Sequence, residues 1–217
     1  MHFVRGRGLI IAIVGGGITL VVLMIIGVYG LLRGPARTSQ PEHPEDGPST
    51  STTSRPPTDR PRPVLATSNP ELFARSVARA LFTWDTRYEG GPSEWAQVIV
   101  DAADVEEAAA VASDVRGYLP DPEMWEQLRP YGTQQWLELE SIVVPDAWST
   151  ALEQAAPGQI PPGAAAFTVM GTRHREGTWA TEVMRTERPA AFTLFVVCPD
   201  QEPCTLLRLS KLDQPLE

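Results

Sequence analysis

The residues best suited to chemistry in this 217-residue sequence are its two cysteines, Cys198 and Cys204, which flank the five residues Pro-Asp-Gln-Glu-Pro. These five residues form the turn between two predicted strands, and facing positions near the end of a hairpin hold their side chains within about 5 Å of each other. We therefore predict a disulfide, which would stabilise the fold by about 2 kcal/mol through closure of a short loop. Two free buried thiols are the alternative. We predict no metal site, because no cluster of His or Cys accompanies the pair.

A catalytic site would need a nucleophile beside a base, paired carboxylates, a metal cluster or a phosphate-binding loop. The only His in the carboxyl-terminal part is His174, which stands between Arg173 and Arg175, where we expect an exposed strand end rather than a catalytic base. The run Gly15-Gly16-Gly17 lies inside an apolar segment and is not a phosphate loop. We therefore predict that the protein is not an enzyme and uses no cofactor.

Basic side chains gather in two neighbouring predicted strands. Together they would form a positive patch suited to contact with a partner. We favour the alternative that they pair with acidic side chains across the strands, because opposite charges at facing positions stabilise a sheet. The basic residues are Arg173, His174, Arg175, Arg185 and Arg188, and the acidic ones are Glu176, Glu182 and Glu187.

The charge of the chain argues against nucleic acid as a partner. The net charge is −9, and residues 64–217 hold eleven basic and twenty-three acidic side chains. Such a domain repels phosphates, whereas non-specific binding of nucleic acid depends on Lys and Arg. Seventeen of the eighteen basic residues are Arg, a bias typical of bacteria with GC-rich genomes.

Leu9–Leu32 is a 24-residue stretch without a charged side chain. As a helix it would be about 36 Å long, enough to span the hydrocarbon core of a membrane. The alternative, a cleaved signal peptide, would have a shorter apolar region followed by a small-residue cleavage site, which Gly34-Pro35-Ala36 matches poorly. We predict a short cytoplasmic tail over residues 1–8 and a transmembrane helix over residues 9–32.

Residues 33–66 contain eight of the twenty-one prolines and a run of Ser and Thr. They cannot bury enough apolar surface to offset the entropy lost on ordering, so we predict a disordered Pro/Ser/Thr-rich linker. A plain spacer is favoured over the alternative of an O-glycosylated stalk. The basic residues that flank the predicted span are nearly balanced. The linker composition and the cysteine pair therefore decide its orientation, and they favour an extracytoplasmic domain over residues 67–217.

This domain begins with helical patterns. Start signals occur at Asn69-Pro70 and Asp121-Pro122, where Asn or Asp caps the helix and Pro suits its first turn. Apolar residues at helical spacing predict a first helix that runs to about Tyr88. Further helical regions are predicted after Pro92, from Asp104 to Val115, and from Asp121 past Pro130 toward Trp136.

The pattern changes after about residue 140. Alternating apolar residues indicate strands, whereas Ala155–Gly163 holds three Pro and two Gly and must be a loop. Helices followed by hairpin-connected strands predict an α+β fold with an antiparallel sheet. The strands are predicted over Ser141–Trp148, Ala165–His174, Trp179–Arg185, Ala190–Cys198 and Cys204–Leu212.

A short inner tail, one membrane span, a linker, and then helices followed by a curved antiparallel sheet resemble bitopic envelope proteins with a nuclear transport factor 2-like (cystatin-like) domain. Two families of this kind are the scaffold subunits of type IV secretion and conjugation machines and the membrane proteins associated with mammalian-cell-entry transporters. The resemblance rests on the helix start at Asn69-Pro70 and the final hairpin from Phe192 to Leu212. It implies a cystatin-like α/β roll with a cone-shaped pocket, with a filled core as the alternative. Residues placed to line such a pocket are Trp95, Trp125, Trp136, Phe167 and Phe195.

The resemblance suggests a non-catalytic scaffold or assembly subunit, with a conjugative or type IV secretion apparatus as its setting. The expected location is the cell membrane, crossed once, with the carboxyl-terminal domain outside the cytoplasm. Its partners would be other envelope proteins or a second copy of itself. One alternative is an extracytoplasmic module that binds a small apolar ligand or lipid. An enzyme that uses the pocket is a third.

Overall fold

The computed structural model describes residues 60–200 and 202–216. The predicted tail, the membrane span and most of the linker lie outside these residues. Within the described part, no helix is long and apolar enough to cross a membrane.

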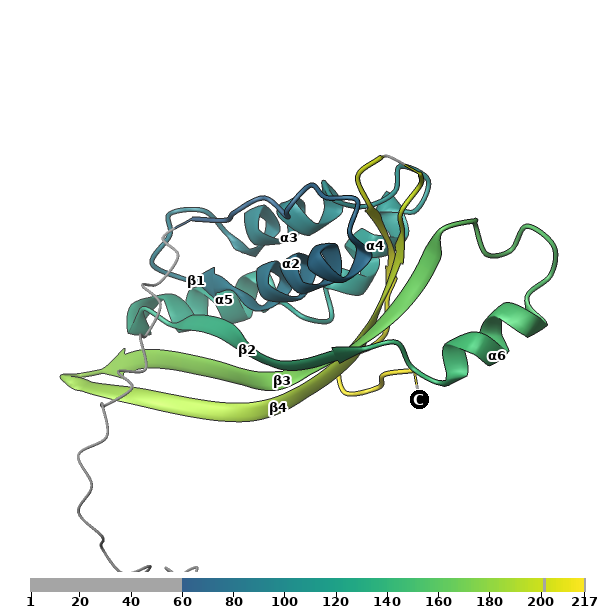
Figure 1. Ribbon diagram of the computed structural model, residues 1–217. Coiled ribbons are helices and arrows are strands. Elements are labelled where there is room, and N and C mark those ends of the chain that lie inside the picture. Colours follow the sequence, from purple (N-terminus) through teal and green to yellow (C-terminus); the bar gives the residue numbers. More distant parts are fainter. Residues whose placement is uncertain (1–59, 201, 217) are drawn as a thin grey trace, which may run out of the picture. The chain divides into compact units, whose positions relative to one another are not determined.

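Five antiparallel strands form one curved sheet in the order β1-β2-β3-β4-β5 (Figure 1). Strands β3 and β4 make a long hairpin, and its free end extends past the helices (Figure 1). Strand β5 pairs with the last residues of β4, and its Leu206 also forms a parallel bridge with Ala103. The strands are β1 (Trp84–Asp85), β2 (Gln134–Val143), β3 (Ala164–Trp179), β4 (Glu182–Val197) and β5 (Thr205–Leu209).

Four helices cover one face of the sheet, which is called the inner face below, while α6 lies apart on the connection between β2 and β3 (Figure 1). Helices packed on a curved antiparallel sheet confirm the predicted α+β class. The helices are α2 (Pro70–Phe82), α3 (Pro92–Val100), α4 (Ala108–Val115), α5 (Pro122–Leu128) and α6 (Ala147–Gln154), with the 3-10 turn η1 (Arg129–Tyr131) after α5.

The main core lies between α2, α4 and the inner face of the sheet. Alternation along β4 buries Phe192, Leu194 and Val196 completely, as the strand pattern predicted. From α2, Val77 and Phe82 pack against this surface and are also fully buried. Since burial of one such side chain contributes about 1.5–3 kcal/mol, this layer holds the helices on the sheet.

The helix starts predicted at Asn69-Pro70 and Asp121-Pro122 are confirmed by their caps. The side chain of Asn69 accepts a hydrogen bond from the backbone N–H of Leu72 at 2.9 Å, and Asp121 accepts one from Met124 at 2.7 Å. Each satisfies a donor that the first helical turn leaves unpaired. The predicted start at Asp104 is wrong, because residues 104–107 form turns and α4 begins at Ala108.

The helix ends differ from the prediction. Helix α2 ends at Phe82 rather than Tyr88, since Thr83 is extended and the chain then pairs as β1 with β2. The helical region predicted to continue toward Trp136 stops at Gly132, whose φ of 53° is left-handed and suits a residue without a Cβ. Trp136 therefore lies in β2.

Two further differences concern the strands. The extended segment predicted over Ser141–Trp148 is in fact the end of β2 followed by the start of α6. The strand predicted over Trp179–Arg185 in fact contains the end of β3 and the hairpin turn, and its residues from Glu182 onward join the predicted strand Ala190–Cys198 in the single strand β4, which passes through Pro189. A Pro is tolerated at this point because, among residues 60–200 and 202–216, no strand pairs with this part of β4 on that side, so no ladder hydrogen bond is lost.

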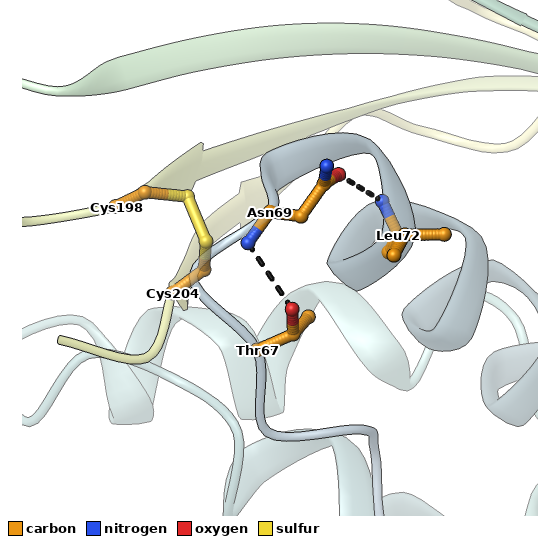
Figure 2. Close-up of a disulfide and its surroundings, with 5 residues drawn as sticks. All are labelled: Thr67, Asn69, Leu72, Cys198 and Cys204. Carbon is orange, nitrogen blue, oxygen red and sulfur yellow. Dashed lines mark hydrogen bonds between the residues drawn. A yellow bond between two sulfur atoms is a disulfide. The ribbon is translucent and has the colours of Figure 1, made fainter. Parts of the chain in front are cut away.

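The predicted disulfide between Cys198 and Cys204 is present, with a Cα–Cα distance of 4.1 Å. It closes the turn between β4 and β5 beside the segment that leads into α2 (Figure 2). The backbone N–H of Cys204 donates to the carbonyl of Thr67 at 2.8 Å, so the cross-linked turn also holds the start of the domain. The alternative of two free thiols is thereby excluded.

Candidate functional site

The five aromatic residues predicted to line a pocket do not share one cavity. Trp95 and Trp125 are buried together with Trp84 in a small core cluster. Phe167 belongs to the main core. The two remaining side chains are partly exposed: Trp136 stacks on His174, and Phe195 contacts Trp148. None of the five lines either of the two hollows described below.

His174 lies within β3 rather than at the end of a strand. Its ring stacks on Trp136 with 5.2 Å between the centroids, and its two nitrogens lie 3.0 Å from Glu138 and 3.3 Å from Glu187. Arg185 is nearby on the same face, paired with Glu176 at 2.6 Å. On this outer face, the predicted pairing of basic with acidic side chains is therefore correct.

The other three basic residues point to the opposite, inner face. Strand alternation puts Arg173 and Arg175 on the side of Phe167 and Val169, and Arg188 faces Arg173 directly across the hairpin. The side chains of Arg173 and Arg188 make no hydrogen bond or ion pair within the described part of the chain. We call Arg173, Arg175 and Arg188 the arginine trio. Like charges at facing positions destabilise a sheet, so the trio costs the fold stability.

Arg175, the member of the trio nearest the hairpin tip, is held in a fixed position. Its guanidinium lies 5.1 Å from the centre of the Trp84 ring, a cation–π geometry. Its Nη2 also donates to the side-chain oxygen of Gln135 at 2.9 Å, and Gln135 is itself fixed by a hydrogen bond to the carbonyl of Phe82. Burial lowers the pKa of Arg175, and the charges of Arg173 and Arg188 lower it further. A guanidinium has five donors, so most of them have no partner among the described residues.

A hollow of about 410 Å³ adjoins Arg175 at the free end of the hairpin. Its size is within the range of about 300–1,000 Å³ that is usual for small-molecule sites. Its apolar lining contrasts with the single cation at its base. The lining residues are Leu128, Tyr131, Thr133, Arg175, Glu176, Gly177, Thr178, Trp179, Met184 and Thr186.

Two aromatic rings form one wall of this hollow. Tyr131 from η1 and Trp179 from the end of β3 stack with their centroids 5.3 Å apart. Trp179 is 63% exposed and Met184, across the hairpin, is 58% exposed. Large apolar side chains that gather in the open beside a cation provide a surface for binding. We call these exposed apolar residues of the hairpin end the tip patch: Tyr131, Trp179 and Met184 beside the hollow, together with Val183, which alternation places on the opposite face.

A second hollow of about 270 Å³ lies between residues 63–66, α3 and the turn that contains Cys204. Val64 and Phe73 line it and also pack against the main core. It has no counterpart to the arginine trio, since its one charged lining residue is Asp101. We therefore regard it as a gap in the packing around the start of the domain.

The groups at the tip are suited to holding an anion beside an apolar surface. Glu176 is among the residues that line the first hollow, but its carboxylate is engaged by Arg185 and by Gln134, the first of these on the outer face. Within residues 60–200 and 202–216, no group of His, Cys, Asp and Glu is placed to hold a metal ion. The hollow offers a fixed guanidinium, threonine hydroxyls and an apolar wall, which together would hold an anion attached to an apolar body.

The sequence predicted the arginine trio only as part of a larger basic cluster, and it did not single out the tip patch. A signal for the trio exists in the sequence, because residues two apart in a strand share a face and Arg173 and Arg175 must therefore separate from His174. No such signal exists for the contact between Tyr131 and Trp179, which joins an irregular turn to a strand end.

Comparisons with protein-family models, curated proteins and solved structures find no match for this chain. The resemblance to nuclear transport factor 2-like envelope proteins therefore stays a prediction based on architecture alone.

Proposed function

We propose that this chain is a non-catalytic envelope protein, anchored in the cell membrane by one span, and that its extracytoplasmic domain acts as a scaffold or assembly subunit. In this proposal the domain binds another envelope protein, or a second copy of itself, through the tip patch. A conjugative or type IV secretion apparatus is the setting suggested by the resemblance.

The observation that carries the proposal is the exposure of the tip patch. Tyr131, Trp179, Val183 and Met184 are 37%, 63%, 55% and 58% exposed, although they come from two separate parts of the chain. Aromatic residues and Met are enriched where proteins bind one another, and Trp and Tyr often dominate the binding energy. The stacking of Tyr131 on Trp179 fixes both rings in advance, which reduces the entropy lost on binding.

Site-specific photo-crosslinking in intact cells tests this proposal. A photoreactive residue replaces Val183, which belongs to the tip patch, and in a matched chain it replaces Val105, which is 92% exposed in a turn of the helical layer. We expect ultraviolet light to give a discrete adduct with a membrane or envelope protein, or a crosslinked dimer, from position 183 only. Equal adducts from both positions, or none from position 183, would contradict the proposed contact.

The second candidate function is a module that binds a small apolar ligand or lipid. It is favoured by the hollow of about 410 Å³ beside Arg175, because ligand sites are mostly apolar and contain a few fixed polar groups. Native mass spectrometry of the protein isolated from membranes would reveal a bound ligand as a discrete increase in mass. The absence of any such species, with or without added lipid, would count against this candidate.

A further inference from the structure

We infer that the hollow at the hairpin tip binds a single-chain amphipathic carboxylate, a molecule of the fatty-acid class, with its carboxylate on Arg175, next to Arg173 and Arg188, and its chain against Tyr131 and Trp179. The inference rests on the second candidate function and names the ligand class of that site. It does not depend on the scaffold role.

The first argument is charge. Residues 64–217 carry eleven basic and twenty-three acidic side chains, so a basic cluster without acidic partners is exceptional within this domain. Arg173 and Arg188 face each other, and Arg175 is the next residue along β3 on the same face, roughly 7 Å away. An anion placed among the three would relieve their mutual repulsion. Arginine also binds carboxylates through two parallel hydrogen bonds.

The second argument is the position of Arg175. Its stacking on Trp84 and its hydrogen bond to Gln135 hold the guanidinium at the base of the hollow. Binding therefore costs little further ordering of this side chain. Because Arg175 is half-buried, a hydrogen bond to it is shielded from water on one side. Such shielding makes a charge-assisted bond stronger than one on an open surface.

The third argument concerns what lies next to the cation. Leu128, Tyr131, Trp179 and Met184 provide an apolar wall that begins beside Arg175, which matches a molecule that has an anionic head and an apolar body. A bare inorganic anion would leave this wall exposed to water. A ligand without charge would leave the three guanidinium groups without an anionic partner.

A peptide fits the site less well than a small amphiphile. Extended peptides gain much of their affinity by adding a strand to a free sheet edge, and no strand of the described part of the chain pairs with the edge of β4 beside the hollow. That edge is protected, however. Every second residue of β4 directs its backbone N–H toward this edge: Ala191 donates to Asp213 and Thr193 donates to Ser210. By this alternation the next edge-facing position is Pro189, which has no N–H to offer an added strand. Prolines and charged side chains of this kind discourage strand addition.

The test is photolabelling of the full-length protein in its native membranes with a diazirine analogue of myristate. Trypsin cuts after Arg175 and Arg185, which releases residues 176–185 as one peptide that contains Trp179 and Met184. We expect the label to concentrate on this peptide. Unlabelled myristate should compete, and myristyl alcohol, which has the same chain without the charge, should compete at least about tenfold less well, since charge-assisted hydrogen bonds are the strong ones.

Two variants complete the test. Arg188→Gln removes one exposed arginine of the trio and should reduce labelling about two- to fivefold, the effect of an exposed charge pair. Arg116→Gln is the matched control, because Arg116 is also exposed but lies at the end of α4. It should leave labelling unchanged.

Three results would overturn the inference: equal competition by the alcohol, equal loss of label in both variants, or no enrichment of label on residues 176–185. Stronger competition by a leucine-terminated peptide acid than by myristate would assign the hollow to a polypeptide instead. A crosslink from Val183 to a partner, together with absent photolabelling, would leave the scaffold proposal standing and remove only this one.

Discussion

Replacement of Arg188 by Glu should stabilise the domain, although most substitutions destabilise a protein. Arg188 faces Arg173 across the hairpin, and neither side chain has an ion-pair partner in the described residues. Facing charges contribute roughly 0.2–1 kcal/mol, with a sign that depends on whether they are alike or opposite. The substitution removes a repulsion and creates an attraction, so the free energy of unfolding should rise by about 0.5–1.5 kcal/mol. For a domain of this size the melting temperature should rise by about 1–6 °C.

Arg185→Glu, the same type of substitution three residues earlier in β4, is the control. Arg185 is paired with Glu176 at 2.6 Å on the outer face, and its side chain is 71% exposed. Arg185→Glu should therefore lower the free energy of unfolding by up to about 1 kcal/mol. Urea unfolding followed by tryptophan fluorescence measures both changes. Both should shrink in 1 M salt, where the screening length is about 3 Å. If Arg188→Glu destabilises the protein and the loss persists in 1 M salt, our description of the inner face is wrong.

Three further outcomes are expected from the core and the cross-link. Reduction of Cys198–Cys204 opens a loop with a sequence separation of 6 and should cost about 2 kcal/mol in urea unfolding, while a chain with serine at both positions should not respond to reductant. Phe192→Ala empties a fully buried position and should cost about 3–5 kcal/mol, against about 0.5 kcal/mol or less for Leu72→Ala at a half-exposed one. Burial raises the pKa of Tyr118 above its ordinary 10.0, so the folded state favours the neutral phenol and should lose stability as the pH rises above about 10. Tyr118→Phe should remove this loss in unfolding measured between pH 8 and 11, at a cost of about 1 kcal/mol at pH 8 for the hydrogen bond to Ser210.

The features that could be predicted from the sequence depend on neighbouring residues. The starts of α2 and α5 were predictable because a cap and a Pro act within one helical turn, as the bonds from Asn69 and Asp121 show. The end of α2 was not, because Trp84 leaves the helical pattern to pair with Gln135, which is 51 residues away along the chain. The apolar spacing of the first helix continues through Trp84, so nothing local marks the change.

The difference between local signals and long-range contacts also explains which features of the strands and of the site could be predicted. The prediction divided β4 into two strands with Pro189 in the gap between them, and the sequence does not show that this Pro lies on a free edge, where a strand can accommodate it. Without one continuous β4 the register of the hairpin is unknown. That register places Arg188 opposite Arg173 on the inner face and Arg185 beside Glu176 on the outer face. The basic cluster was therefore predictable, but its division was not.

The charge pairing on the two faces of the β3–β4 hairpin can be compared directly. The faces share a backbone, but on the outer face His174 and Arg185 each meet a carboxylate, whereas the inner face carries the arginine trio. Acidic side chains were thus available at neighbouring positions, and a single exchange of Arg188 for Glu would have paired Arg173 as well. Proteins commonly retain such a local cost where function requires it. Because Arg175 of the trio lines an apolar hollow, an amphipathic anion accounts for both features, whereas a general need for solubility accounts for neither.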